Sequence, residues 1–356
     1  MKNSLYAIAC VSLLTFAGCK KSNNNVTTTG PTETQVLTDF SNDLANPNYQ
    51  DIQAKAGVMN TAIDSLVLNT NTTNLNTART AWVNTRRAWE SCEGYLFGPV
   101  EDDNYDPDTD SWPVDAVELD SLLSSSNALT VGDISALPQT LKGYHAIEYI
   151  IFGEGSTAKA SDITPRQKQF LSSLAQSIYN TTTNLRNSWD PLQGDFTAQV
   201  IGAGTAASTY FTSRQAAFLT IVGSMSDICD EVANSKMQTP FAARDSTLDE
   251  SSFSHNSIID FTNNITGIQN AYFSRYNNAG GHSLHELVAA KNASLDATLQ
   301  SQMQAAISSF GIITTTFEKA IYTQRNQVAS VQNTINTLKA TLDGQLTTFV
   351  KTNIKD

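Results

Sequence analysis

Apolar residues recur at intervals of three and four positions along almost the whole chain after residue 35, and this helical period constrains the fold most strongly. Sustained alternation of apolar and polar residues, which indicates half-buried strands, is nearly absent. Thr164 and Pro165 mark one helix start, because threonine caps helices and proline suits their first turn. The pattern predicts an all-α protein with helices over residues 36–46, 52–68, 73–97, 115–124, 138–152, 164–189, 206–237, 256–272, 283–291, 295–310 and 314–350.

The helical part of the chain is longer than one bundle core usually serves. Pro191 and Gly194 interrupt the pattern directly after a long predicted helix. We therefore predict two antiparallel helical-bundle domains packed side by side, formed by residues 35–190 and residues 191–356.

The first residues have the features of a bacterial lipoprotein signal. Lys2 precedes an apolar run too short to span a bilayer, and the small residues after that run end in Cys19. We predict that residues 1–19 are the signal, that Cys19 becomes the acylated end, and that the polar residues 20–34 form a disordered tether. The lipid would anchor the protein in the bacterial cell envelope, at the outer membrane facing the periplasm.

The formal net charge is −12, and lysine and arginine residues are not clustered. This balance argues against nucleic acid as a partner and is compatible with cations. Of the four cysteines, Cys92 and Cys229 remain once the signal is removed and Cys19 is acylated. A disulfide between them and two separate buried thiols are both open.

His145 and Glu148 lie three residues apart inside the apolar run 143–153. On a helix this spacing places an imidazole and a carboxylate on one face, where they can share a cation. The pair offers two ligands at most, so a metal site needs others from elsewhere in the chain. The alternative is a core histidine that is hydrogen-bonded to Glu148.

Gly143, His145 and Glu148 reproduce the G-x-H-x-x-E motif of the imelysin-like family, which the chain resembles. The resemblance extends over nearly all of the chain from residue 35 and includes residues 80–100, 110–115, 253–260 and 283–288. The family is classed among metallopeptidases and is related to periplasmic iron-uptake proteins. The resemblance implies the same two-bundle architecture and a metal ion held by His145 and Glu148.

The resemblance also implies roles for residues outside the motif. Glu93 lies in the stretch that resembles the family's upstream helix and would be a third metal ligand, with Asp115 and Arg87 as supporting residues. The alternatives are ion pairing along that helix, between Glu93 and arginines such as Arg86, and helix capping by Asp115.

Other patterns do not support a site. The acidic residues 101–110 lack the glycine and the glutamate that a calcium loop requires, so we predict a solvated loop. His282 and His285 fall where the family pattern does not require histidine, so with Glu286 they are predicted to lie at the surface. Motifs for a nucleophilic serine, a phosphate loop, a dinucleotide fold or an H-E-x-x-H zinc site are absent from the sequence.

We therefore expect a lipoprotein that binds a divalent or ferric metal ion where the two bundles meet. Iron is the expected metal and zinc the alternative, since mixed nitrogen and carboxylate ligands suit both. Iron uptake is the expected role, with envelope iron-transport components as partners. One alternative is a metal-dependent peptidase with Glu148 as its base. Another is a module that binds a polysaccharide or a heme-like ligand between Trp82, Trp89 and Trp112.

Overall fold

The computed structural model describes residues 31–355, and the chain from Pro31 onward forms one compact unit. The predicted signal, Cys19 and residues 20–30 of the predicted tether lie outside the described residues. Within the described part, the only strands are the two-residue β1 (Arg275–Tyr276) and β2 (Ala279–Gly280), which pair antiparallel. The prediction of an all-α protein is confirmed.

Most of the helical residues belong to α-helices. In chain order these are α1 (Glu33–Asp39), α2 (Asn46–Leu68), α3 (Thr72–Glu90), α4 (Pro99–Asp102), α5 (Tyr105–Asp110), α6 (Ala116–Ser124), α7 (Val131–Ser135), α8 (Gly143–Phe152), α9 (Pro165–Trp189), α10 (Phe196–Ile201), α11 (Arg214–Asp230), α12 (Gln238–Ala243), α13 (Ser257–Phe273), α14 (Leu284–Lys291), α15 (Ala293–Ser309), α16 (Phe317–Thr323), α17 (Arg325–Thr341) and α18 (Thr347–Asn353). Short 3₁₀ or π turns are η1 (Phe40–Ala45), η2 (Glu93–Tyr95), η3 (Gln139–Leu141), η4 (Glu154–Ser156), η5 (Ala160–Asp162), η6 (Glu231–Lys236), η7 (Ser246–Leu248), η8 (Phe310–Ile312) and η9 (Leu342–Leu346).

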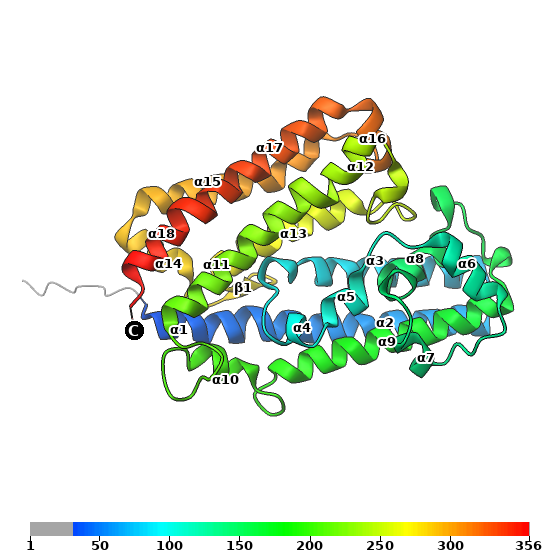
Figure 1. Ribbon diagram of the computed structural model, residues 1–356, viewed down its shortest axis with the longest axis horizontal. Helices are drawn as coiled ribbons and strands as arrows, with labels where there is room; N and C mark the ends of the chain where they lie inside the picture. Colours follow the sequence, from blue (N-terminus) through cyan, green and yellow to red (C-terminus); the bar gives the residue numbers. More distant parts are fainter. Residues whose placement is uncertain (1–30, 356) are drawn as a thin grey trace, which may run out of the picture. The chain divides into compact units, whose positions relative to one another are not determined.

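Two groups of helices pack within this unit (Figure 1). In the first group α2 lies between α3 and α9, and α8 packs against α3 and α9. In the second group α11, α13, α15 and α17 pack around a shared core. The start of α9 is as predicted, because the Thr164 side chain accepts a hydrogen bond from the backbone N–H of Gln167 and Pro165 follows it.

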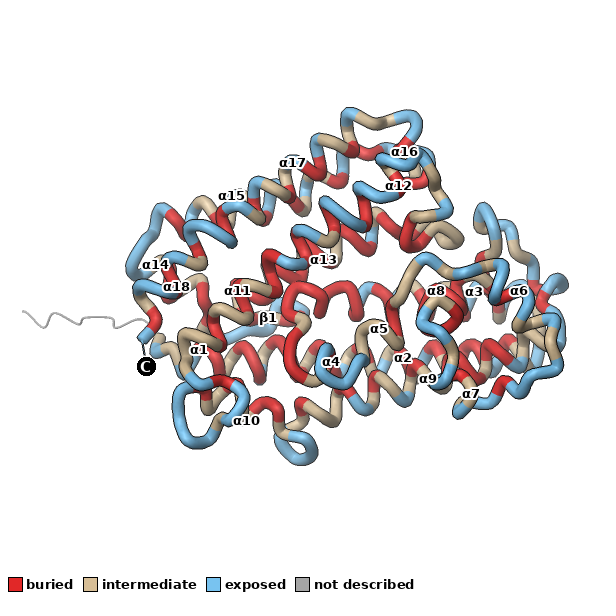
Figure 2. Tube along the Cα trace, viewed as in Figure 1, coloured by how far each residue is buried: buried red, intermediate tan, exposed pale blue. Residues whose placement is uncertain are grey.

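The two groups meet where α3 and η2 pack against α11 and α13. Residues 88–95 are all buried there and form a continuous buried run in Figure 2. The backbones touch because two glycines face each other. A Cβ atom on Gly94 would lie 2.5 Å from the carbonyl carbon of Gly267, and one on Gly267 would lie 2.7 Å from the carbonyl oxygen of Ser91. This close contact determines how near α3 and α13 approach each other, and therefore which of their side chains meet.

Some predicted helices differ from the observed ones. The helix predicted over residues 206–237 begins only at Arg214, because the Gln199 side chain accepts hydrogen bonds from the backbone N–H groups of Thr209 and Tyr210 at 2.8 and 3.1 Å and holds a loop. The helix predicted over residues 314–350 is interrupted at Gln324, whose backbone leaves the helical region.

The acidic residues 101–110 were predicted to form a solvated loop, and this prediction is wrong for part of the segment. They form the short helices α4 and α5, and Asp110 at the end of α5 is only 4% exposed. The predicted boundary at residue 190 stays a prediction. The helix that follows it, α10, packs against α1 and α9 of the first group.

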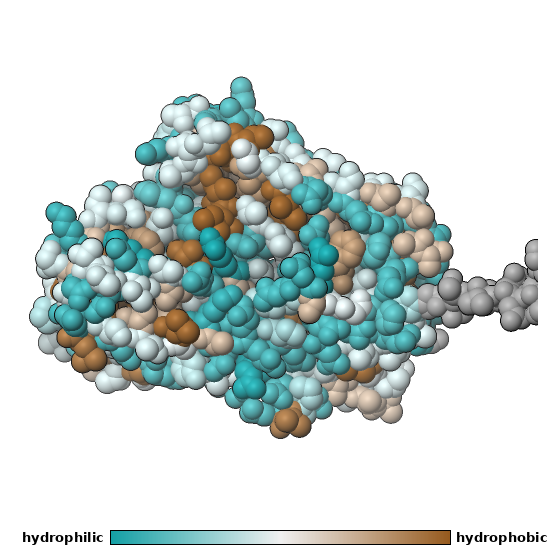
Figure 3. Space-filling model, turned by 180° about the vertical axis from the view of Figure 1, so that it is seen from behind, coloured by the Kyte–Doolittle hydropathy of each residue, from teal (hydrophilic) through white to brown (hydrophobic). Residues whose placement is uncertain are grey.

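Cys92 and Cys229 are both buried free thiols, and burial raises the pKa of each. Among the described residues, no helix combines the length and apolarity needed to span a membrane. The face of the molecule drawn in Figure 3 is largely hydrophilic, with hydrophobic residues gathered mainly in its upper half.

Candidate metal centre

The motif glycine brings α8 against the end of α5. Gly143 has φ +78°, and a Cβ atom there would lie 2.3 Å from the carbonyl oxygen of Thr109. Only glycine permits this contact between the backbones. Because Asp110 follows Thr109, and His145 lies at the start of α8, the contact places the two side chains next to each other.

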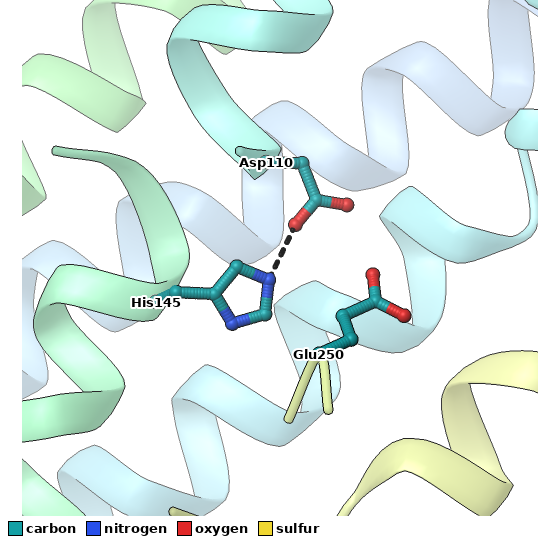
Figure 4. A group of neighbouring side chains, drawn as sticks. All are labelled: Asp110, His145 and Glu250. Carbon is teal, nitrogen blue, oxygen red and sulfur yellow. Dashed lines mark hydrogen bonds and ion pairs between the residues drawn. The ribbon is translucent and has the colours of Figure 1, made fainter. Parts of the chain in front are cut away.

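His145 is 1% exposed and lies between two carboxylates. Its Nε2 is 3.0 Å from Asp110 Oδ1, drawn in Figure 4, and its Nδ1 is 2.9 Å from Glu148 Oε2. Burial alone would lower the pKa of His145, but the hydrogen bonds to Asp110 and Glu148 outweigh burial and raise it to about 10. In the metal-free protein both ring nitrogens therefore donate hydrogen bonds.

Glu148 is held by both of its oxygens. Oε2 accepts from His145, and Oε1 accepts a 2.7 Å hydrogen bond from the backbone N–H of Ser254. Ser254 belongs to the segment between η7 and α13, which is bonded to the second helix group because the Ser251 hydroxyl donates to Asp260 of α13 at 2.6 Å. The carboxylate of Glu148 therefore links the two groups and fixes the His145 ring.

Arg86 of α3 is fully buried and pairs with carboxylates from several elements. Its guanidinium contacts Glu90 and Asp110, and its Nη2 lies 2.9 Å from Glu250 Oε1 and 3.7 Å from Asp260 Oδ2. Burial alone would raise the pKa of Asp110, but the nearby Arg86 and His145 outweigh burial and lower the pKa far below its usual range.

Lys236 is the second buried cation. Its Nζ lies 2.9 Å from Glu93 Oε2 and 2.9 Å from Glu250 Oε1, and it sits 4.8 Å from the centre of the Trp112 ring. Asn264 of α13 also donates to Glu93, at 2.7 Å. Burial and the neighbouring Glu90 raise the pKa of Glu93 even though Lys236 opposes them.

We call this assembly the buried ionic cluster. It contains six buried carboxylates, from Glu90, Glu93, Asp110, Glu148, Glu250 and Asp260, and three buried cationic side chains, from Arg86, Lys236 and His145. Among the described residues, Asp110 Oδ2 and Glu250 Oε2 are buried without a hydrogen-bond partner. The carboxylates outnumber the cationic side chains, and two of their oxygens have no partner. A bound cation would balance this negative charge and supply the missing partner.

Two sets of donor atoms within the described residues are close enough to hold one metal ion. Asp110, His145 and Glu250 each offer an atom within 4.8 Å of the others, as do Glu90, Glu93 and Asp110. Figure 4 shows the first set, in which α5, α8 and the segment before α13 each supply one side chain. Asp110 belongs to both sets.

The residues predicted from the sequence are distributed differently. His145 and Glu148 bond to each other, and Glu93 belongs to the buried ionic cluster but bonds to Lys236. Asp115 caps α6 by accepting from the backbone N–H of Glu118 at 2.9 Å. Arg87 is exposed and lies in a surface groove, and its neighbour Arg86 occupies the buried position.

The remaining predicted residues lie elsewhere. Trp82 and Trp89 are wholly buried core residues, so neither can line a ligand groove. His282 and His285 bond to different carboxylates, Glu286 at 3.1 Å and Asp296 at 2.6 Å, and the donor sets above include neither histidine.

Sequence reasoning missed the most connected residues. Asp110 was assigned to a solvated loop, although it begins the stretch 110–115 that resembles a family segment. Lys236 and Glu250 carry no motif, and their neighbours in the sequence are mostly polar, so no local signal marks either residue as buried. Their positions depend on packing between segments more than a hundred residues apart.

A pocket of about 730 Å³ lies beside the buried ionic cluster. Tyr149, Phe253 and His255 line it, and these residues neighbour Glu148 and Ser254 in the chain. The rings of Tyr149 and Phe253 meet edge to face at 5.2 Å. Phe253 and His255 line the pocket, whereas the backbone N–H of Ser254 between them donates to Glu148.

Comparison with known proteins gives consistent results. The chain is 25% identical over 357 residues to iron-regulated protein A of Synechococcus elongatus, covering 99% of this chain and 95% of that protein. A crystal structure described as an iron-regulated protein A precursor from Parabacteroides distasonis superposes with a TM-score of 0.80 at 23% identity, over 92% of this chain and 97% of the other.

An imelysin-like protein from Psychrobacter arcticum superposes with a TM-score of 0.73 at 14% identity, over 90% of this chain and 95% of the other. At these identities the two structures show a shared fold. The family model described as Imelysin matches residues 45–345, which include Gly143, His145, Glu148 and every member of the buried ionic cluster. The chain therefore belongs to the imelysin family.

Proposed function

We propose that this chain binds one metal ion through Asp110, His145 and Glu250, with iron as the expected metal. The supporting observation is the first donor set: three buried side chains with donor atoms within 4.8 Å, two of which carry unpartnered carboxylate oxygens. One imidazole and two carboxylates are a ligand set that suits iron, manganese or zinc. The name of the Synechococcus relative, an iron-regulated protein, favours iron.

Glu148 has a separate role in this proposal. Metal-binding histidines commonly use one ring nitrogen for the metal and the other for a carboxylate that fixes the ring. Glu148 holds Nδ1 of His145 at 2.9 Å, which leaves Nε2 directed at Asp110. Metal binding would then replace the proton on Nε2, so the protein should release protons as it takes up the ion.

Glu93 and Glu90 provide further carboxylates in the same proposal. They form the second donor set with Asp110, and Asn264 donates to both of them. An ion that moved from the first set to the second would keep Asp110 as a ligand. Glu93 is therefore a ligand of the second arrangement, beyond the three residues of the first.

Metal titration of matched histidine variants tests the proposal. Metal-free protein should take up one equivalent of Fe²⁺ under anaerobic conditions, and His145→Gln should weaken binding by about a hundredfold. His282→Gln is the matched control, because His282 also bonds to a glutamate but lies at the surface, and its affinity should equal the parent's. Equal affinity of the His145 variant and the parent would contradict the proposal.

A peptidase would need a carboxylate free to activate water. Both oxygens of Glu148 are already engaged, which fits a positioning role. Metal-loaded protein is therefore expected to leave a denatured polypeptide intact. Chelator-sensitive cleavage that Glu148→Gln abolishes while metal content is retained would establish the peptidase function instead.

We propose that the protein acts in iron uptake at the cell envelope and is anchored there by a lipid on Cys19. The support is the signal-like sequence of residues 1–19, with a cysteine at the cleavage position. Cys19→Ala should move the protein from the membrane fraction to the soluble fraction on cell fractionation. Retention of this variant in the membrane would show that the anchor lies elsewhere.

A further inference from the structure

A second feature lies beside the contact between α3 and α13. A groove of about 380 Å³ is lined by residues of α2, α3, α13 and β1 and of the turns next to them. Positions 87 and 88 of α3, its C-cap position 91, and positions 263, 266 and 270 of α13 line it, and each set lies on one helix face. Ser91 lines the groove and is also the residue whose carbonyl oxygen faces Gly267, so the groove lies next to the close backbone contact.

The charge of this groove is opposite to that of the molecule. Lys55, Arg87 and Arg275 all line it, and none of its lining residues is an aspartate or a glutamate. The whole chain has 34 acidic and 22 basic residues. A local excess of cations on an acidic protein attracts anions and holds them against the repulsion of the remaining surface.

Two of the cations are held in place. Arg275 donates from Nη2 to Gln269 Oε1 at 3.1 Å and lies 4.7 Å from the centre of the Phe273 ring. Lys55 pairs at 2.5 Å with Asp51 Oδ2, which also accepts from the hydroxyl of Tyr276. Asp51 thus offsets one of the three positive charges and leaves the two arginines uncompensated.

Arg87 is free to bind a ligand. Its guanidinium has no hydrogen-bond or ion-pair partner among residues 31–355, although the group lines the groove. The side-chain amides of Asn270, Asn277 and Asn278 line the groove too, and add donors that a carboxylate can use. A guanidinium binds a carboxylate through two parallel hydrogen bonds, and such charge-assisted bonds are strong.

We propose that this groove binds a small polycarboxylate anion. The cations come from three separate elements, α2, α3 and β1, so they match a ligand whose charged groups are also separated. A volume of about 380 Å³ is at the lower end of the range for small-molecule sites. This site lies outside the buried ionic cluster and does not depend on a metal.

Calorimetric titration of the purified, chelator-treated protein with tricarballylate tests this proposal. Tricarballylate carries three carboxylates and lacks the hydroxyl group of citrate, so it is a weak metal chelator. One molecule should bind per chain at low salt, and binding should weaken as salt is raised. Arg87→Gln and Arg275→Gln should each lower the affinity about tenfold, as expected for loss of a charge-assisted hydrogen bond.

Arg166→Gln is the matched control, because Arg166 lies on α9 and bonds to Gln169, away from the groove. This variant should bind tricarballylate as tightly as the parent does. Circular dichroism would show that each variant is folded. Absence of saturable binding, or parental affinity in the Arg87 and Arg275 variants, would overturn the proposal. Tighter binding of inorganic phosphate than of tricarballylate would overturn the assignment to polycarboxylates.

Discussion

At the scale of single residues, Asp110 organises the candidate metal centre. One of its oxygens contacts both Arg86 and His145, and the other is buried without a partner among the described residues. A buried carboxylate remains charged only when cations or hydrogen bonds compensate for lost hydration. Asp110 therefore stays ionised at neutral pH and ready to accept a further cation.

Asp106 lies one helical turn before Asp110, and its pKa is shifted in the opposite direction. Burial, followed by repulsion from Asp110, raises the pKa of Asp106 to about 7. An acid whose pKa is raised by folding binds more protons in the folded state than in the unfolded state, so stability falls as pH rises from about 4 through 7. At pH 5 the group is protonated in the folded protein, and at pH 8 it is charged and destabilising.

Asp106→Asn should therefore stabilise the protein more at pH 8 than at pH 5. The upper limit of the difference between pH 5 and pH 8 is about 2.7 kcal/mol, because the folded state keeps about one extra proton from pH 5 up to its pKa of about 7, and water near the group will reduce this value. Urea unfolding of the parent and the variant at both pH values measures the effect. The same difference in the free energy of unfolding at pH 5 and pH 8 would contradict this account.

At the scale of elements, the contact between η2 and α13 holds the two helix groups together. Gly267→Ala would place a Cβ atom 2.7 Å from the carbonyl oxygen of Ser91, so the backbones must separate. The expected loss is about 1–3 kcal/mol in the free energy of unfolding, as for other overpacked sites. Gly223→Ala is the control, because a Cβ atom at Gly223 in α11 has no neighbour within 4 Å and alanine favours a helix.

Denaturant unfolding of both variants measures the difference. Gly223→Ala should be neutral or stabilising by up to about 1 kcal/mol. If Gly267→Ala were as stable as Gly223→Ala, the helices would be able to move apart without loss, and the close contact would not determine their spacing.

Elements differ in how well the sequence predicts them. The helix from residue 164 to residue 189 was predicted at both ends, because its period, cap and proline are local signals. The loop before Arg214 was missed, because its conformation depends on the side chain of Gln199. Local patterns identify helices, whereas interruptions caused by a distant side chain leave no local signal.

The candidate site shows the same limit. His145 and Glu148 were predicted to lie on one helix face, and they hydrogen-bond to each other. The roles of Asp110 and Glu250 could not be predicted, because Glu250 reaches the site only when α13 packs against α3. Which of the two neighbouring arginines, Arg86 or Arg87, is buried also depends on which face of α3 is turned inward.

At the scale of the whole molecule, a metal ion should stabilise both helix groups together. Asp110 and His145 come from the first group, and Glu250 comes from the segment leading to the second. A ligand that binds only the folded state adds about 2.7 kcal/mol at a hundred times its Kd. Unfolding followed by tryptophan fluorescence and by circular dichroism should give one coincident transition that shifts with metal. Two separate transitions would show that the groups unfold independently.

The buried ionic cluster also determines the order in which the newly made chain can fold. Glu90 and Glu93 leave the ribosome long before Lys236 and Asn264, which supply their buried cation and amide donor. Until those partners arrive, the inward face of α3 carries carboxylates that are more stable in water than in a closed core. The first helices are therefore expected to stay open during synthesis until residues 236 and 264 have been made.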